Sequence, residues 1–249
     1  MAGSMEFLSA NLINTTSLYA VASGTATAAY LIDRNTNTRY QSSGIPVSTT
    51  VQIVVTFPST LSVSHVLLQG INSKNVFVYA DTTTNILFSS SDNSATTIYS
   101  EVSTTSVKVV YVDFNNPFVG TDKYISELSL HTRLLEFERN PSSDDYKPTI
   151  FRKQVEHEMP DGGVVLFNVR DKFRVKMSWD YITESFFNDL QDVYATGDPF
   201  VFVPFPTTTA WDGKAYPVVW PGQFDFRHTT NDKVQGYSGS ITLKETPSS

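Results

Sequence analysis

Residues 172–203 contain the only stretch of the chain with a clear helical period, and strand patterns enclose it on both sides. Lys172 to Met177 alternates charged and apolar residues, the two-residue period of a half-buried strand. From Thr183 onward the apolar residues follow one face of a helix, at Phe186, Phe187, Leu190, Val193 and Tyr194. Thr183 is a suitable N-cap, and Gly197 before Asp198-Pro199 ends the helix. We therefore expect one α-helix, about 183–195, in a mainly β chain.

Composition limits the partners that the chain can take. Hydrophobic residues make up 40% of the 249 residues and charged residues only 17%, so Ser, Thr and Asn must cover much of the surface. The net charge of −7 argues against nucleic acid or an anionic membrane as the main partner. The chain has no cysteine, which excludes disulfides and thiolate metal sites and favours synthesis in a reducing cytoplasm. No apolar run is long enough for membrane insertion, and no signal peptide is evident.

Charge density divides the sequence into two predicted domains. Residues 5–135 are poor in charge, residues 136–249 are much richer, and residues 1–4 have the character of a cloning remnant. The segment from Asn140 to Pro148 has the composition of a linker or long loop. In the first domain, short β runs at 51–57, 63–70, 75–79, 106–112 and 124–131 predict an antiparallel sandwich.

The first domain resembles discoidin-type (coagulation factor 5/8 type C) domains. The resemblance rests on residues 29–44, where a Leu-Ile-Asp turn leads through a Thr to an aromatic residue, and on the strands at 51–57 and 65–70. It implies a jelly-roll β-sandwich whose loops at one end bind sugars or lipid headgroups. The candidate ligand-binding residues that it implies are Asp33, Asn35, Thr38 and Gln41. Tyr40 replaces the usual tryptophan of that family, and the cysteines of its secreted members are missing.

The second domain is predicted to be β-rich, with one helix. Strands at 150–158 and 164–177 are joined by a Pro160–Gly163 turn, which predicts a hairpin. The helix and a Phe200–Val203 strand follow, and further strands are expected at 218–220, 223–227 and 234–243. The order of Trp179, the capped helix, the Phe-rich strand and the closing 236–241 strand is similar to small β domains of tailed-phage tail and baseplate proteins. That resemblance implies assembly with copies of itself and with other phage tail proteins.

No constellation of reactive side chains is evident. Ser64 and His65 are neighbours on a predicted strand, so their side chains are expected on opposite faces and not as a nucleophile–base pair. Acidic residues such as Asp189 and Asp192 are interpreted as a solvated helix surface. Residues 33–44 do not form an EF-hand, because that loop needs glycine at its sixth position and glutamate at its twelfth. We expect no enzyme activity, no metal and no cofactor, with calcium in a less regular loop kept as an alternative.

Trp211 lies at a predicted loop tip and is the remaining candidate ligand-binding residue, with folding back onto its own domain as the alternative. Together these features predict a structural protein of a tailed-phage virion, at the tail tip or baseplate, synthesised in the host cytoplasm. Host surface glycan is a further expected partner, through the first domain. The alternative function is a stand-alone carbohydrate-binding, lectin-like module. The two hypotheses are compatible, since a tail protein can use such a domain to grip host glycans.

Overall fold

The computed structural model describes residues 4–13, 18–21, 28–35, 37–42, 44–159, 164–206, 215–229 and 236–246. Its contacts divide the chain into two compact units. Unit 2 is built mainly from Leu8–Arg133, and unit 1 from Leu134–Phe205, Lys214–Pro247 and the N-terminal residues up to Phe7. The N-terminal segment joins unit 1 because Phe7 packs on Phe137 and Phe200, with ring centroids 4.8 and 4.7 Å away.

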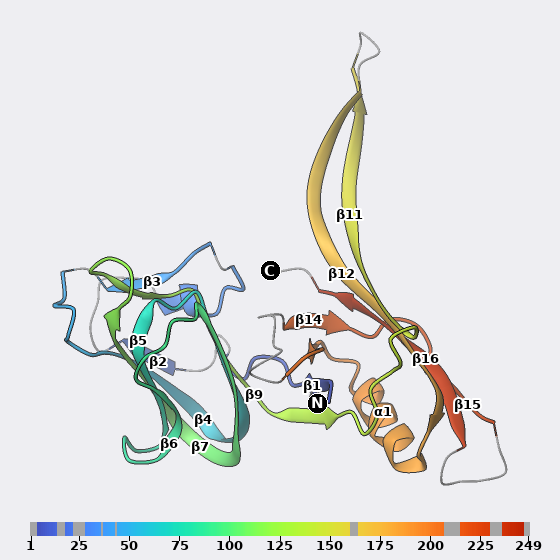
Figure 1. The fold of residues 1–249 in the computed structure, drawn as a ribbon, viewed down its shortest axis with the longest axis horizontal. Helices are drawn as coiled ribbons and strands as arrows, with labels where there is room; N and C mark the ends of the chain where they lie inside the picture. Colours follow the sequence, from blue (N-terminus) through green and yellow to red (C-terminus); the bar gives the residue numbers. More distant parts are fainter. Residues whose placement is uncertain are drawn as a thin grey trace. The chain divides into compact units, whose positions relative to one another are not determined.

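Unit 2 is an antiparallel β-sandwich (Figure 1). Its main sheet has the order β2 (Leu18–Val21), β4 (Val51–Gln69), β7 (Thr97–Pro117), β5 (Ser73–Ala80), β6 (Ile86–Ser90), and β9 (Glu127–His131) also pairs with β4. A two-stranded sheet joins β3 (Tyr40–Ser42) to β8 (Lys123–Ile125), and a short 3₁₀ helix, η1, spans Ala28–Leu31. The predicted mainly β fold with an N-terminal sandwich is therefore confirmed.

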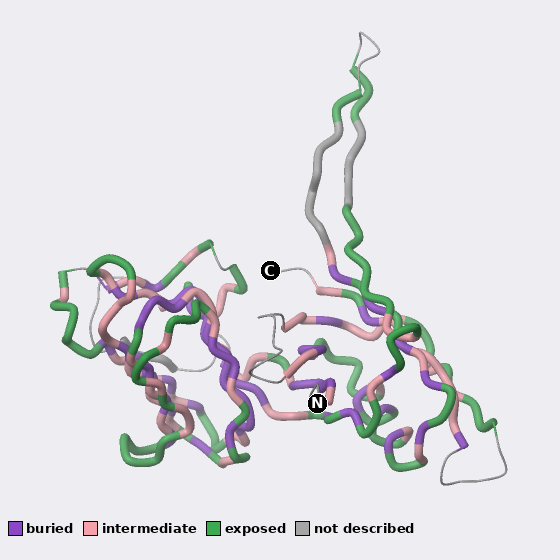
Figure 2. Tube along the Cα trace, in the orientation of Figure 1, coloured by how far each residue is buried: buried purple, intermediate pink, exposed green. Residues whose placement is uncertain are grey.

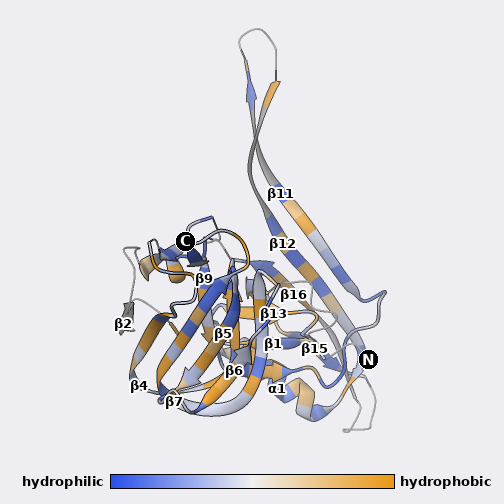
Figure 3. Ribbon diagram, turned by 60° about the vertical axis from the view of Figure 1, so that its left-hand side comes forward, coloured by the Kyte–Doolittle hydropathy of each residue, from blue (hydrophilic) through white to orange (hydrophobic). Residues whose placement is uncertain are grey.

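Two-residue alternation positions the core of unit 2. Val51, Ile53, Val55 and Phe57 on β4 are fully buried, whereas the residues between them are half-buried. Figure 3 shows the matching alternation of hydropathy along β4 and β7. The predicted strands at 51–57 and 63–70 are one strand, β4, and the predicted strand at 124–131 is divided between β8 and β9, which belong to different sheets.

Unit 1 contains one larger sheet with the order β10 (Arg133–Glu136), β1 (Glu6–Leu8), β13 (Phe200–Val203), β14 (Tyr216–Val219), β16 (Tyr237–Glu245), β12 (Val164–Ile182), β11 (Tyr146–Glu158). The remaining strand, β15 (Asp225–His228), pairs with β16. The predicted hairpin of β11 and β12 is present, and both strands are longer than expected. Its predicted turn at 160–163 lies outside the described residues.

The predicted helix is confirmed as α1 (Glu184–Thr196). The Thr183 hydroxyl accepts a hydrogen bond from the Phe186 N–H at 3.1 Å, as an N-cap should. Gly197 ends the helix in the left-handed conformation, with φ of 67°. Phe186, Leu190 and Val193 face the core. None of the described helices is long and apolar enough to cross a membrane.

Aromatic rings dominate the core of unit 1. Phe137, 1% exposed, contacts the rings of Trp179, Phe186 and Phe202 at centroid distances of 5.7, 5.6 and 6.4 Å. The Phe-rich segment that follows α1 contributes Phe200 and Phe202 to this core. Figure 2 shows that buried residues are concentrated at the base of the β11–β12 hairpin and are absent from its described outer part.

Candidate functional site

The loop between η1 and β3 is closed by its own polar side chains. The Asp33 carboxylate accepts hydrogen bonds from the Asn35 N–H at 2.9 Å and from the Thr38 hydroxyl at 2.6 Å. The Asn35 side chain in turn accepts from the Asn37 N–H at 3.1 Å. Such Asx turns let the chain reverse direction without regular structure. The structure therefore brings the predicted residues Asp33, Asn35 and Thr38 together, and it uses their side chains to fix the loop.

Glu127, the first residue of β9, completes this loop from far away in the sequence. Its carboxylate accepts a hydrogen bond from the Asn35 N–H at 2.7 Å. Burial, followed by a hydrogen bond shared with the Asp33 carboxyl group, raises the pKa of Glu127 to about 8. For Asp33, burial acts to raise the pKa, but hydrogen bonds from Thr38 and Glu127 outweigh it and lower the value. At pH 7 the raised pKa favours the protonated form of Glu127, which can share its proton with the Asp33 carboxylate.

This loop has the oxygen chemistry that a hard cation needs. Two carboxyl groups and the Thr38 hydroxyl lie together, and loop carbonyls are close in sequence. A divalent cation would displace the shared proton, because carboxylates bind metal in their ionised form. The described residues contain no group of three or more His, Cys, Asp or Glu side chains that could hold a metal ion. A cation here would therefore depend on hydroxyl and carbonyl oxygens as well as on Asp33 and Glu127.

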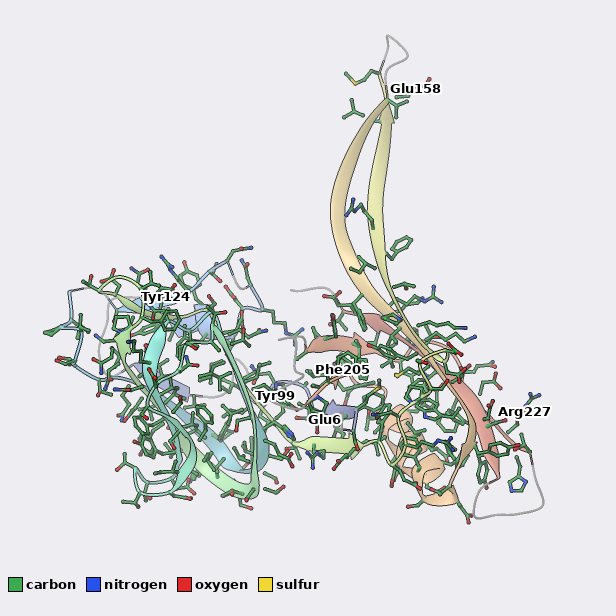
Figure 4. All side chains as sticks on the ribbon, viewed as in Figure 1. Glu6, Tyr99, Tyr124, Glu158, Phe205 and Arg227 are labelled. Carbon is green, nitrogen blue, oxygen red and sulfur yellow. The ribbon has the colours of Figure 1, made fainter. Side chains whose placement is uncertain are left out.

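The loop leads through Arg39 into β3, whose outward face carries the second half of the site. Gln41 and Tyr124 oppose each other in the β3–β8 register and share this face. The Gln41 amide donates a hydrogen bond to the Asp122 carboxylate at 2.7 Å. The Arg39 guanidinium lies 4.4 Å from the centroid of the Tyr124 ring. Figure 4 shows Tyr124 at the β3–β8 side of its unit.

The backbone beneath these side chains is held by buried polar residues. The Asn72 side chain donates to the Asp122 carbonyl at 2.8 Å and accepts from the Tyr124 N–H at 2.9 Å. Lys123, between them, is fully buried and donates to the Pro46 carbonyl at 2.8 Å. Burial lowers the pKa of Lys123, opposed by the charge of Asp122. The outward groups are therefore presented by a rigid support and not by a loose loop.

Sequence reasoning placed Gln41 in this region but missed Arg39, Asp122, Tyr124 and Glu127. Gln41 meets Asp122 across 81 residues, and Asn35 meets Glu127 across 92, so no local pattern connects them. The one available signal is Glu127, the only acidic residue in the predicted strand 124–131. Trp211 lies outside the described residues, and its role stays a prediction.

The expectation that Ser64 and His65 point to opposite faces is wrong. Ser64 Oγ lies 2.8 Å from His65 Nδ1, beside a register shift of β4 against β7 that breaks the alternation. Arg133 Nη2, which can only donate, lies 3.5 Å from His65 Nε2. Ser64 Oγ also donates to the His131 carbonyl at 3.4 Å and accepts from the Arg133 N–H at 2.6 Å, so the contact belongs to a buried network of hydrogen bonds.

No protein-family model matches the chain, and no curated protein is similar enough to count as a match. Several solved structures resemble it. Chitosan-binding module 1 of a chitosanase/glucanase from Paenibacillus sp. IK-5 is 15% identical, with a TM-score of 0.42, over 49% of this chain and 99% of that chain. A GH29 fucosidase from Ruminococcus gnavus in complex with fucose is 16% identical, with a TM-score of 0.43, over 50% of this chain and 27% of that chain.

A third similar structure is CpGH89CBM32-5 from Clostridium perfringens, in complex with GalNAc-β-1,3-galactose. It is 12% identical, with a TM-score of 0.40, over 47% of this chain and 95% of that chain. Each likeness extends over about half of the present chain. At these TM-scores none of them identifies the ligand or the family of this protein.

Proposed function

We propose that unit 2 binds carbohydrate through the outward face of β3 and β8, at Arg39, Gln41, Asp122 and Tyr124. The contact that carries this proposal is the 2.7 Å hydrogen bond that fixes the Gln41 amide against Asp122, next to the Arg39–Tyr124 pair. An aromatic ring offers an apolar wall to the C–H groups of a sugar. Planar amide, carboxylate and guanidinium groups can bond its hydroxyls. Because these groups are ordered before any ligand arrives, little conformational entropy is lost on binding.

The Asp33–Glu127 loop supports this face. Thr38, bound to the Asp33 carboxylate, directly precedes Arg39, so the loop sets the position of the guanidinium over Tyr124. The resemblance of residues 29–44 to discoidin-type domains, in which loops at one end bind sugars, agrees with this location. Asp33, Asn35 and Thr38 then act as supports of the site, and Gln41 as a group that contacts the ligand.

Glycan-array binding followed by calorimetry on the full chain tests the proposal. Tyr124→Ala and Arg39→Ala should each weaken binding about tenfold or more, since each removes a central contact of a small interface. Tyr181→Ala is the matched control, because Tyr181 is a 51% exposed tyrosine of the other unit. Circular dichroism must show that the variants are folded. Binding to no glycan, or equal binding by all three variants, would refute the assignment.

A structural role in a tailed-phage tail is a second proposal, and it rests on the similarity of the second domain to small β domains of tailed-phage tail and baseplate proteins. The absence of enzyme activity and the location in the virion belong to this proposal and stay predictions. Detection of the chain in purified particles by immunoelectron microscopy tests the role. A protein found only in soluble host fractions would count against it.

A further inference from the structure

The β11–β12 hairpin extends beyond the sheet that anchors it (Figure 1). Arg174 is the β12 residue nearest the tip that pairs with β16, opposite Lys244. From Phe173 to Val164, β12 pairs only with β11 among the described strands. We call residues 147–174 the arm. A two-stranded hairpin is at best marginally stable in water, so this length of unsupported ribbon calls for a further contact.

Apolar side chains of the arm lie in solvent. Val175 and Met177 are fully buried on the core face of β12, and Phe173 is 7% exposed. Ile150, the residue opposite Phe173 on that same face, is 74% exposed. Phe151, on the other face, is 62% exposed. Nearer the tip, Val164 is 54% exposed, and it lies opposite Glu158, which Figure 4 labels. Ile150 and Phe151 lie on opposite faces, and only Phe151 shares its face with Lys172, the residue opposite it.

The face of the arm that points away from the core is basic. The described cations on this side, together called the basic face, are Lys147, Lys172 and Arg174 of the arm, Lys176 at its base and Lys244 of the adjoining strand β16. Like charges oppose each other directly in the pairs Lys147↔Lys176 and Arg174↔Lys244. Such pairs destabilise a sheet, so the stability of the arm cannot explain them. Asp145 approaches Lys147 at one end. Within the described residues, no ion pair joins Lys172, Arg174 or Lys176 to a carboxylate.

The same unit carries a surface of opposite charge around α1. The chain contains no Lys or Arg between Lys176 and Lys214. Exposed carboxylates on and beside the helix form what we call the acidic surface, Asp180, Glu184, Asp189, Asp192 and Asp198. Asp180, the member of the acidic surface that lies on β12, is four residues from Lys176 and eight from Lys172, about 13 and 26 Å at about 3.3 Å per residue. Lys172 and Arg174 are therefore too far along the strand to pair with Asp180 of their own chain.

We propose that the basic face of one copy docks against the acidic surface of a second copy, with Phe151 buried in the contact. Each copy offers both surfaces, so the association is head-to-tail and closes into a ring or continues as a filament. Because each copy carries both a basic and an acidic surface, a second copy of the chain is the partner whose charges fit. Docking also supplies the contact that the arm lacks alone.

Sedimentation velocity of the full chain at 50 and 500 mM salt tests the proposal. The wild type should associate at low salt and dissociate at high salt, because exposed charges are screened. An arm variant carries Lys172→Glu, Arg174→Glu and Lys176→Glu, and a helix variant carries Asp180→Lys, Asp189→Lys and Asp192→Lys. Each should weaken association about 100-fold, since like charges then face each other. Phe151→Ser should weaken it without changing its salt dependence.

Mixing the two variants gives the deciding result. The acidic arm of one fits the basic helix of the other, so the mixture should associate although neither variant does alone. A control variant with Lys74→Glu, Lys108→Glu and Arg227→Glu carries the same charge change at exposed sites elsewhere and should associate as the wild type does. A wild type that is monomeric at low salt, or a mixture that stays monomeric, would overturn the proposal. If the wild type binds a DNA duplex, and the arm variant loses that binding while its self-association is unchanged, the basic face binds a polyanion and the proposal is wrong.

Discussion

Replacing Glu127 with Gln should remove a large part of the pH dependence of unit 2 stability. The folded pKa of Glu127 is raised from 4.5 to about 8 by burial and by the hydrogen bond with Asp33. Folding therefore takes up a proton between these two values, and the stabilisation is complete below pH 4.5 and lost as pH rises through 8. The pKa difference corresponds to about 5 kcal/mol at most. Because solvent screens this loop, we expect about 1–2 kcal/mol to be lost between pH 6.5 and 8.5.

Urea unfolding of the wild type and of Glu127→Gln at pH 6.5, 7.5 and 8.5 in EDTA measures this loss. Far-UV circular dichroism should follow the transitions, while tryptophan fluorescence in a Trp211→Phe background, which keeps Trp179 and Trp220 of unit 1, marks the transition that belongs to the other unit. Burial lowers the pKa of His131 from 6.5 to about 4, so the stability that neutral His131 contributes is lost as pH falls from 6.5 to 4, below this window. Asp92→Asn is the control, because Asp92 is an exposed carboxylate of the same unit. Parallel pH profiles for the wild type and Glu127→Gln would refute the shared proton.

Three further predictions follow from named contacts. Calcium should stabilise unit 2 and release close to one proton per ion at pH 7. Calorimetry in two buffers of different ionisation enthalpy measures the number of protons released. If Asp33→Asn is as stable as the wild type in calcium, no cation binds in this loop. Thr183→Ala should cost about 1 kcal/mol by removing the N-cap of α1, and Thr183→Ser should restore it, both read from tryptophan fluorescence in urea. Phe137→Ala should cost about 3–5 kcal/mol in the same assay, since it empties the centre of the aromatic core; a cost below 1 kcal/mol would show that this ring is not central.

Local signals predicted the helix well and the strand ends poorly. The cap at Thr183, the apolar period and Gly197 all lie within one short segment, so nothing distant is needed to place α1. Pro58, Ser59 and Thr60 have turn character, but they are exposed residues of the continuous strand β4, where the pairing with β7 shifts register. Turn-forming residues cannot show by themselves whether a long strand bends or ends.

The site was predicted only where its residues are close in sequence. Asp33, Asn35 and Thr38 belong to one loop and are bonded to one another, as their spacing suggests. The Asp122–Tyr124 half of the face depends on the pairing of β3 with β8. The raised pKa of Glu127 depends on β9 lying beside the loop. The Ser64–His65 contact shows the same limit, because a register shift between strands overrides the expected alternation.

The two proposals together predict that self-association raises the strength of glycan binding to surfaces. The glycan face belongs to unit 2, and the basic face and acidic surface belong to unit 1, so the two activities use separate residues. A ring or filament presents several glycan sites at once, which can increase the apparent affinity for a dense surface by about 10²–10⁴ without any new sugar contact. The arm variant should therefore keep the wild-type affinity for a soluble monovalent glycan and lose most of its retention on a glycan-coated sensor. Tyr124→Ala should lose both. Equal loss of monovalent and surface binding in the arm variant would show that the two activities are not separable, because the charge reversals would then have damaged unit 2 itself.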